Sequence, residues 1–124
     1  MTSHTGISRL SIDGINEHFQ SPQLIYLGKE QAVCYVLRTL LTKDTYGTEL
    51  IDALEKNFPR YRLSDTVLYI ALQFLEDEGI TIAYSKKTEG RGRPRRMYKL
   101  AASRRKEAQA LALLWSATEL KQFI

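Results

Sequence analysis

Residues 64–100 read SDTVLYIALQFLEDEGITIAYSKKTEGRGRPRRMYKL, and the spacing of apolar residues changes once along this stretch. Its first part has the spacing of a buried helical stripe, carried by Leu68, Ala71, Leu72 and Leu75. Ser64 is placed to cap this helix and Asp65 falls in its first turn, where a capping role is favoured over base contact. Gly79 is placed to end it.

The second part of the stretch has a period of two. ITIAYS at 80–85 and RRMYKL at 95–100 alternate apolar and polar residues, which predicts the two strands of a hairpin. The connection KKTEGRGRPRR at 86–96 is much longer than a two-residue turn, and its glycines and proline oppose a regular ladder. We therefore expect an extended basic loop, the wing of a winged helix.

Two further helices are predicted before Ser64. Residues 29–43 carry a broad apolar stripe at Ala32, Val33, Val36, Leu37, Leu40 and Leu41. The next helix begins after KDTYG at 43–47, with Thr45 placed to cap it, and Pro59 prevents its continuation. A short helix, the tight connector PRYRL at 59–63 and the helix that opens at Ser64 together indicate a helix-turn-helix.

The fold class is therefore α+β, mainly α: a winged helix-turn-helix with a two-stranded wing and a long C-terminal helix. We predict an N-terminal extension at 1–28, a DNA-binding domain at 29–101 and a dimerisation helix at 102–124. Apolar residues lie on more than one face of that last helix, which predicts a homodimer through Leu111, Leu114, Trp115 and Phe123. Within 1–28 we expect a short amphipathic helix around Ile12, Ile15 and Phe19, and an extended LIYL at 24–27 placed to pack across the dimer.

Charge is distributed unevenly along the chain. Between Lys86 and Lys106 ten side chains are basic and only Glu89 is acidic, a net charge of +9, whereas the other 103 residues carry −5. A basic run can be a solvated loop, but beside a helix-turn-helix it favours a polyanionic partner.

Length and composition argue against several other classes of protein. A chain of 124 residues is sized for one globular domain, and no apolar run is long enough to cross a bilayer. The single cysteine and the absence of a leader-like start favour the cytoplasm, and Cys34 is interpreted as a packing residue rather than a redox sensor. His4 and His18 lie outside any catalytic or metal-binding pattern, so we do not expect an enzyme or a bound cofactor. We also do not expect a membrane partner.

Three motifs resemble the PadR-like family of winged-helix transcription regulators. YGTEL at 46–50 is similar to the family's His-Gly-Tyr-Glu-Leu signature, and residues 64–80 are similar to its recognition helix. GRGRPRRMYKL at 90–100 is similar to its wing, with Gly92, Arg93, Arg96, Tyr98 and Leu100 in place. Ile70, where the family usually has proline, and LAASRRKE at 100–107 depart from the pattern. The resemblance covers roughly residues 29–115 and implies a regulator of transcription.

Duplex DNA would meet three groups of residues. The groove-facing candidates lie on the exposed side of the helix after Ser64, and they are Ser64, Thr66, Tyr69 and Gln73. Phosphate contacts are expected from the start of the helix that follows KDTYG and from the connector at 59–63. These residues are Thr45, Tyr46, Thr48, Arg60 and Arg62. The wing would add Lys86, Lys87, Arg91, Arg93, Arg95 and Arg96.

The sequence of the wing also indicates the base composition of the preferred DNA. RGRP at 91–94 is the core of AT-hook peptides, whose arginines lie in narrow minor grooves, so we expect A·T-rich flanks and, for a dimer, a palindromic operator. Repression by exclusion of polymerase is favoured over activation. The alternative, a winged-helix module that binds RNA or a protein partner, would use the same basic surface.

Overall fold

The computed structural model describes residues 10–20, 23–90 and 92–122. These residues form five helices and five strands. In order they are α1 (Ile12–Gln20), β1 (Ile25–Tyr26), α2 (Lys29–Leu40), β2 (Thr45–Tyr46), α3 (Gly47–Asn57), β3 (Tyr61–Arg62), α4 (Asp65–Asp77), β4 (Thr81–Lys86), β5 (Arg95–Leu100), a 3-10 turn (Ala102–Arg104) and α5 (Arg105–Gln122).

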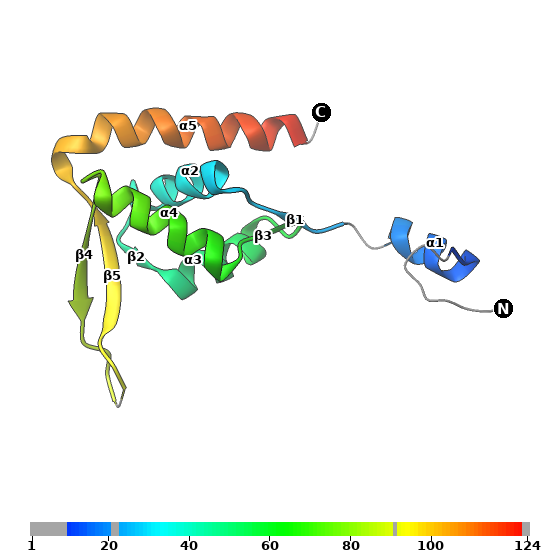
Figure 1. Ribbon diagram of the computed structural model, residues 1–124, viewed down its shortest axis with the longest axis horizontal. Helices are drawn as coiled ribbons and strands as arrows, with labels where there is room; N and C mark the ends of the chain where they lie inside the picture. The colour runs from blue at the N-terminus through cyan, green and yellow to red at the C-terminus, as the bar shows by residue number, and fades with distance from the viewer. Residues whose placement is uncertain (1–9, 21–22, 91, 123–124) are drawn as a thin grey trace.

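Helix α2 lies at the centre of the molecule, with α5 along one side of it and α4 on another (Figure 1). Most of its apolar stripe is buried as the spacing predicts, with Val36 and Leu37 completely inaccessible to solvent, whereas Val33 and Leu41 are half-buried. Trp115 of α5 lies over the same core, where its ring centroid is 5.5 Å from that of Tyr61 and 5.8 Å from that of Tyr35. Because α5 shares this core, it is part of the folded body.

Helices α3 and α4 form the predicted helix-turn-helix. The Ser64 hydroxyl accepts a hydrogen bond from the backbone N–H of Val67 at 3.2 Å, which confirms Ser64 as the N-cap of α4. Gly79 follows α4 with a φ of +74°, a left-handed conformation that glycine adopts without steric cost. The N-terminus predicted for α3 is wrong by one residue, because Tyr46 rather than Thr45 occupies the N-cap position.

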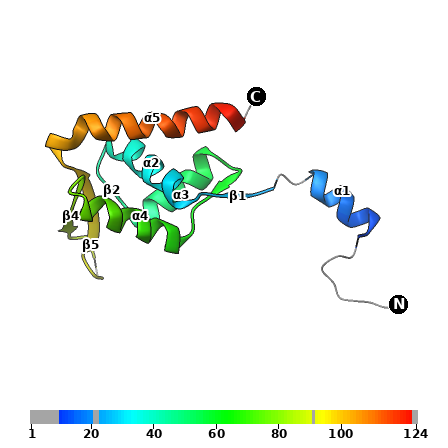
Figure 2. The ribbon, with the colours of Figure 1, turned by 45° about the horizontal axis from the view of Figure 1, so that its top comes forward.

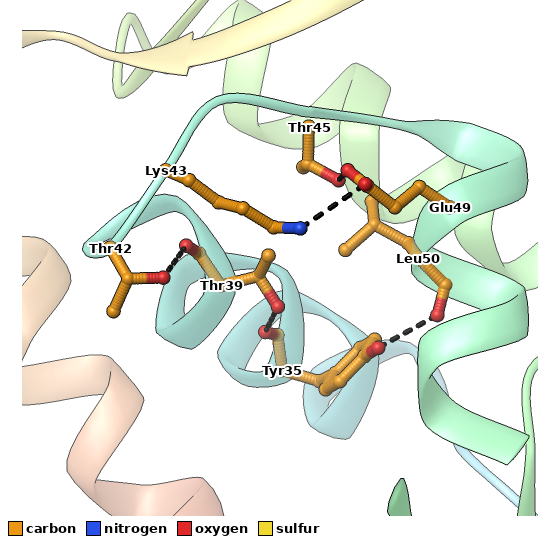
Figure 3. Close-up of polar contacts among 7 residues, drawn as sticks. All are labelled: Tyr35, Thr39, Thr42, Lys43, Thr45, Glu49 and Leu50. Carbon is orange, nitrogen blue, oxygen red and sulfur yellow. Dashed lines mark hydrogen bonds and ion pairs between the residues drawn. The ribbon is translucent and has the colours of Figure 1, made fainter. Parts of the chain in front are cut away.

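Thr45 has a different role from the predicted cap. Its hydroxyl donates a 2.7 Å hydrogen bond to Glu49 Oε1, and Lys43 Nζ donates to Glu49 Oε2 at 3.1 Å (Figure 3). Tyr35 of α2 donates from its hydroxyl to the carbonyl of Leu50 at 2.7 Å. These bonds attach the first turn of α3 to the middle of α2 and to the segment that connects the two helices.

Strands β4 and β5 are the predicted hairpin, and β5 also pairs with β2 on its other side. The sheet is antiparallel in the order β2-β5-β4, with Tyr98 opposite both Thr45 and Ala83. Strand β1 pairs in parallel with β3 of the same chain. LIYL is extended at Ile25 and Tyr26, as expected, and its packing across a dimer stays a prediction.

Helix α1 is set apart from the rest of the described chain in both views (Figures 1 and 2). It is the short helix expected around Ile12 and Ile15, and these two side chains are exposed. None of the described helices combines the length and the apolar character needed to cross a bilayer.

Candidate nucleic-acid interface

The wing and the start of α4 lie on the side of the molecule away from α5. In both views α5 runs along one side of the body, and the β4–β5 hairpin extends away from that side (Figures 1 and 2). The N-terminal end of α4 also lies away from α5. The helix and the hairpin can therefore meet one extended ligand together.

The outer face of α4 carries most of the predicted groove-facing residues. Thr66, Tyr69 and Gln73 are exposed, with Tyr69 at 66%. Ser64 is half-buried, and its hydroxyl is occupied by the capping bond to Val67. The Gln73 amide donates to Asp77 Oδ1 at 3.0 Å on the helix surface, so base contact would exchange this bond for one to DNA.

The predicted phosphate contacts before α4 separate into exposed and structural residues. Thr48 and Arg60 are exposed. Arg62 is half-buried, and its Nη1 donates to the carbonyls of Pro59 and Tyr61 at 2.8 Å each, which holds the connector in shape. Thr45 is completely buried, so its side chain does not reach DNA in this structure, and that prediction is wrong.

The base of the wing is held by side chains as well as by strand pairing. We define the wing base as Tyr84 with residues 95–98. The Tyr84 hydroxyl donates to Asp44 Oδ2 at 2.6 Å, and this bond raises the pKa of the phenol. The Arg95 guanidinium lies 4.0 Å from the centre of the half-buried Tyr46 ring.

Arg96 is the most heavily bonded basic residue of the wing base. Its Nη2 donates to both carboxylate oxygens of Glu76 at 3.0 Å, and its Nε donates to the Tyr98 hydroxyl at 3.1 Å. These hydrogen bonds to Tyr98 and Glu76 raise the pKa of Arg96 further above its usual range. A guanidinium in this position is already paired with an anion.

The wing tip, residues 86–94, has the opposite character. The side chains of Lys86, Lys87 and Arg93 are exposed, and none of them makes a hydrogen bond or an ion pair with the described part of the chain. Gly90 and Gly92 have φ values of +85° and +121°, and a Cβ at either position would meet nothing within 4 Å. Arg91 lies outside the described residues. The tip therefore presents uncompensated positive charge on a backbone that can approach a groove closely.

The predicted dimer residues lie on two sides of α5. Trp115 is 1% exposed and belongs to the core, so its assignment to an interface is wrong. Leu111 is half-buried and also packs on the core. Leu114 is 57% exposed, and Leu113, which the sequence analysis missed, is 68% exposed. Phe123 lies outside the described residues.

Cys34 lies in the core beside α5, with 8% of its surface exposed. Burial raises the pKa of its thiol, which disfavours the reactive thiolate and agrees with a packing role. The described residues contain no group of three or more histidine, cysteine, aspartate or glutamate side chains arranged to hold a metal ion.

Known proteins resemble this chain both in its central part and over most of its length. Residues 36–110, from α2 into α5, match the family described as "Transcriptional regulator PadR-like family". The comparison with curated proteins found no significant match.

Two solved structures are similar to nearly the whole chain. One is the circadian clock associated protein Pex from Anabaena, with 47% identity and a TM-score of 0.82, covering 93% of this chain and 100% of the other. The second is Pex from Synechococcus sp., with 56% identity and a TM-score of 0.84, covering 88% and 97% of the two chains. A transcriptional regulator from Clostridium thermocellum, 21% identical over 77% of this chain and 95% of its own, shares the fold at a TM-score of 0.62.

Proposed function

The chain belongs to the PadR-like family of transcriptional regulators, and from this premise we propose that it represses transcription as a homodimer bound to a palindromic, A·T-rich operator. Membership makes the chain a DNA-binding transcription regulator. The operator, the direction of regulation and the dimer are the parts that we add. A repressor of this kind would act in the cytoplasm, where it meets the DNA of a prokaryotic cell.

One observation carries the proposal: the N-terminal end of α4 and the β4–β5 hairpin both lie on the side of the molecule away from α5, and Thr66, Tyr69 and Gln73 of α4 are exposed. The major groove of B-DNA, about 12 Å wide, admits a helix. With α4 in the groove, the basic wing tip would lie against the adjoining backbone or minor groove. Tyr69 and Gln73 are the exposed side chains best placed to reach base edges or the phosphates beside them.

The A·T preference rests on the chemistry of the wing tip. Narrow A·T-rich minor grooves have an enhanced negative potential that attracts arginine. Arg93 is exposed and follows Gly92, whose open surroundings let the backbone approach the groove floor. We propose that Arg93, with Arg91, inserts there.

The dimer is proposed to form through the outer face of α5. Leu113 is 68% exposed on a helix whose opposite face is already committed to the core. A two-fold dimer would present two α4 helices to successive major grooves, about 34 Å apart on one side of the duplex. Bound across a promoter, such a dimer would exclude polymerase.

The process controlled is proposed from the similar clock protein. The Anabaena protein is named as circadian clock associated and is 47% identical over nearly the full length. We propose that this chain also regulates a clock gene. Deletion of its gene should change the period of a rhythmic promoter-driven reporter in the source organism, and an unchanged period would contradict this role.

The central experiment is selection of bound duplexes from a random library, followed by titration of the selected duplex in increasing salt. We expect an inverted repeat with A·T-rich flanks, and a slope of log affinity against log salt of roughly −7 to −9 if about 8 to 10 phosphates are neutralised. Replacing the flanks with G·C pairs should weaken binding. Stronger competition by single-stranded RNA than by duplex would instead support the RNA-binding alternative.

A further inference from the structure

Arg96 differs from the other basic residues of the wing because an acidic residue of α4 holds it. Glu76 lies in the last full turn of α4, and Arg96 is the second residue of β5, twenty positions later in the chain. Arg96 Nη2 is 3.0 Å from both carboxylate oxygens. The contact therefore joins the helix proposed to read bases to the strand that carries the wing.

We propose that Glu76 is a specificity-determining positioning residue, which withholds Arg96 from DNA phosphates and fixes the wing base against α4. This inference rests on the proposed binding of a duplex operator. Glu76 does not itself contact DNA in this proposal. Its effect is exerted through Arg96.

The withholding follows from charge and geometry. The carboxylate compensates the guanidinium charge, so moving Arg96 to a phosphate would leave Glu76 unpaired beside a polyanion. The side chain is also held by the Tyr98 hydroxyl at 3.1 Å and lies 5.5 Å from the centre of that ring. Lys86, Lys87 and Arg93 have no such compensation among the described residues. Within the wing, phosphate affinity is thereby concentrated at the tip.

The positioning follows from where the contact lies. Arg96 is opposite Ser85 of β4, at the level where the hairpin leaves the body, and the next residue, Met97, begins the part of β5 that pairs with β2. An anchor at this level limits the swing of the wing tip relative to α4. A fixed angle lets the helix and the wing engage only duplexes of matching groove geometry, which favours the operator over other DNA.

The test compares Glu76→Gln with Glu78→Gln. Both variants remove one negative charge from the C-terminal end of α4, but Glu78 is exposed and its side chain has no ion pair to any described residue. On a random-sequence duplex of about 25 base pairs, Glu76→Gln should steepen the salt slope by about one, because freed Arg96 reaches one more phosphate. Glu78→Gln should leave the slope unchanged.

A second variant separates the release of Arg96 from the loss of charge. Glu76→Gln combined with Arg96→Gln should return the salt slope to the wild-type value. If the double variant keeps the steeper slope, or if Glu76→Gln and Glu78→Gln behave alike, the inference is overturned. Thermal melts of each variant check that the fold is retained.

Specificity provides the last readout. The ratio of affinities for the selected duplex and the random duplex should fall about threefold in Glu76→Gln, in the range that exposed ion pairs contribute. An unchanged ratio would contradict the positioning role. If the wild-type protein itself does not distinguish the two duplexes, the proposed function fails, which is a different result from failure of the Glu76 variants.

Discussion

The wing base and the wing tip both carry basic residues, but these residues have different contacts. At the wing base, Arg95 lies on the Tyr46 ring and Arg96 is paired with Glu76. At the wing tip, Lys86, Lys87 and Arg93 project without a charged partner in the described part of the chain. A run of basic residues is therefore not a uniform electrostatic surface, because contacts with the body decide which charges remain for a partner.

The largest difference between base and tip should appear in stability. Tyr98→Ala would remove a side chain that is 8% exposed and packs in the core, at a cost of about 3 kcal/mol of unfolding free energy. Lys87→Ala at the tip should change it by less than about 0.5 kcal/mol. Urea denaturation followed by circular dichroism measures both. Equal losses would break the distinction.

For DNA binding, substitutions at the wing tip should have a larger effect than substitutions at the wing base. Replacing Lys86, Lys87 and Arg93 together with alanine should flatten the salt slope on random-sequence duplex by roughly three, one for each cationic side chain that no longer neutralises DNA charge. The melting temperature should stay within a few degrees of the wild-type value, because these side chains are exposed. A slope that does not change would show that the tip does not contact phosphates.

A smaller effect is expected from the stacked pair at the base. Tyr46→Leu would remove the aromatic face that lies 4.0 Å from the Arg95 guanidinium. We expect a loss of about 0.5–1 kcal/mol in unfolding free energy. Arg95→Ala on the Tyr46→Leu background should cost little more, and additive losses would contradict the pairing.

The smallest effect concerns acid stability. The hydrogen bond from Thr45, together with Lys43, lowers the pKa of Glu49 below its ordinary value of 4.5. A lowered folded-state pKa means that the charged carboxylate stabilises the fold above that ordinary value, and that this contribution is lost as pH falls through the folded-state pKa. Glu49→Gln should therefore lose less stability than the wild-type protein as the pH is lowered below 4.5 in denaturant titrations. Parallel pH profiles would contradict this.

Much of the fold could be predicted because its main elements carry strong local patterns. The spacing of Leu68 to Leu75 and the alternation on either side of the glycine-rich loop each extend over enough residues to establish a period. Strands β2 and β3 are not predicted from the sequence, since each has only two residues and is defined by its partner strand. For β1, which lies within the LIYL segment expected to be extended, the sequence does not indicate the partner strand. A two-residue segment has no period to detect.

The candidate site was predicted less completely for the same reason. Burial of Thr45 depends on β5, fifty residues later, and the position of Trp115 depends on which face of an evenly apolar α5 meets α2. The pairing of Arg96 with Glu76 joins residues twenty positions apart. Residue type alone indicates that these groups can bind a partner, whereas the tertiary contacts decide which partner they have.

Amide hydrogen exchange with and without the selected duplex tests the shared DNA-facing surface most directly. We predict that duplex DNA slows exchange in residues 65–73 of α4 and in residues 86–95 of the wing together, while residues 105–115 of α5 exchange as in the free protein. Protection of α5 with no change in the wing, or protection of only one of the two predicted segments, would contradict the claim that α4 and the wing tip bind DNA as one surface.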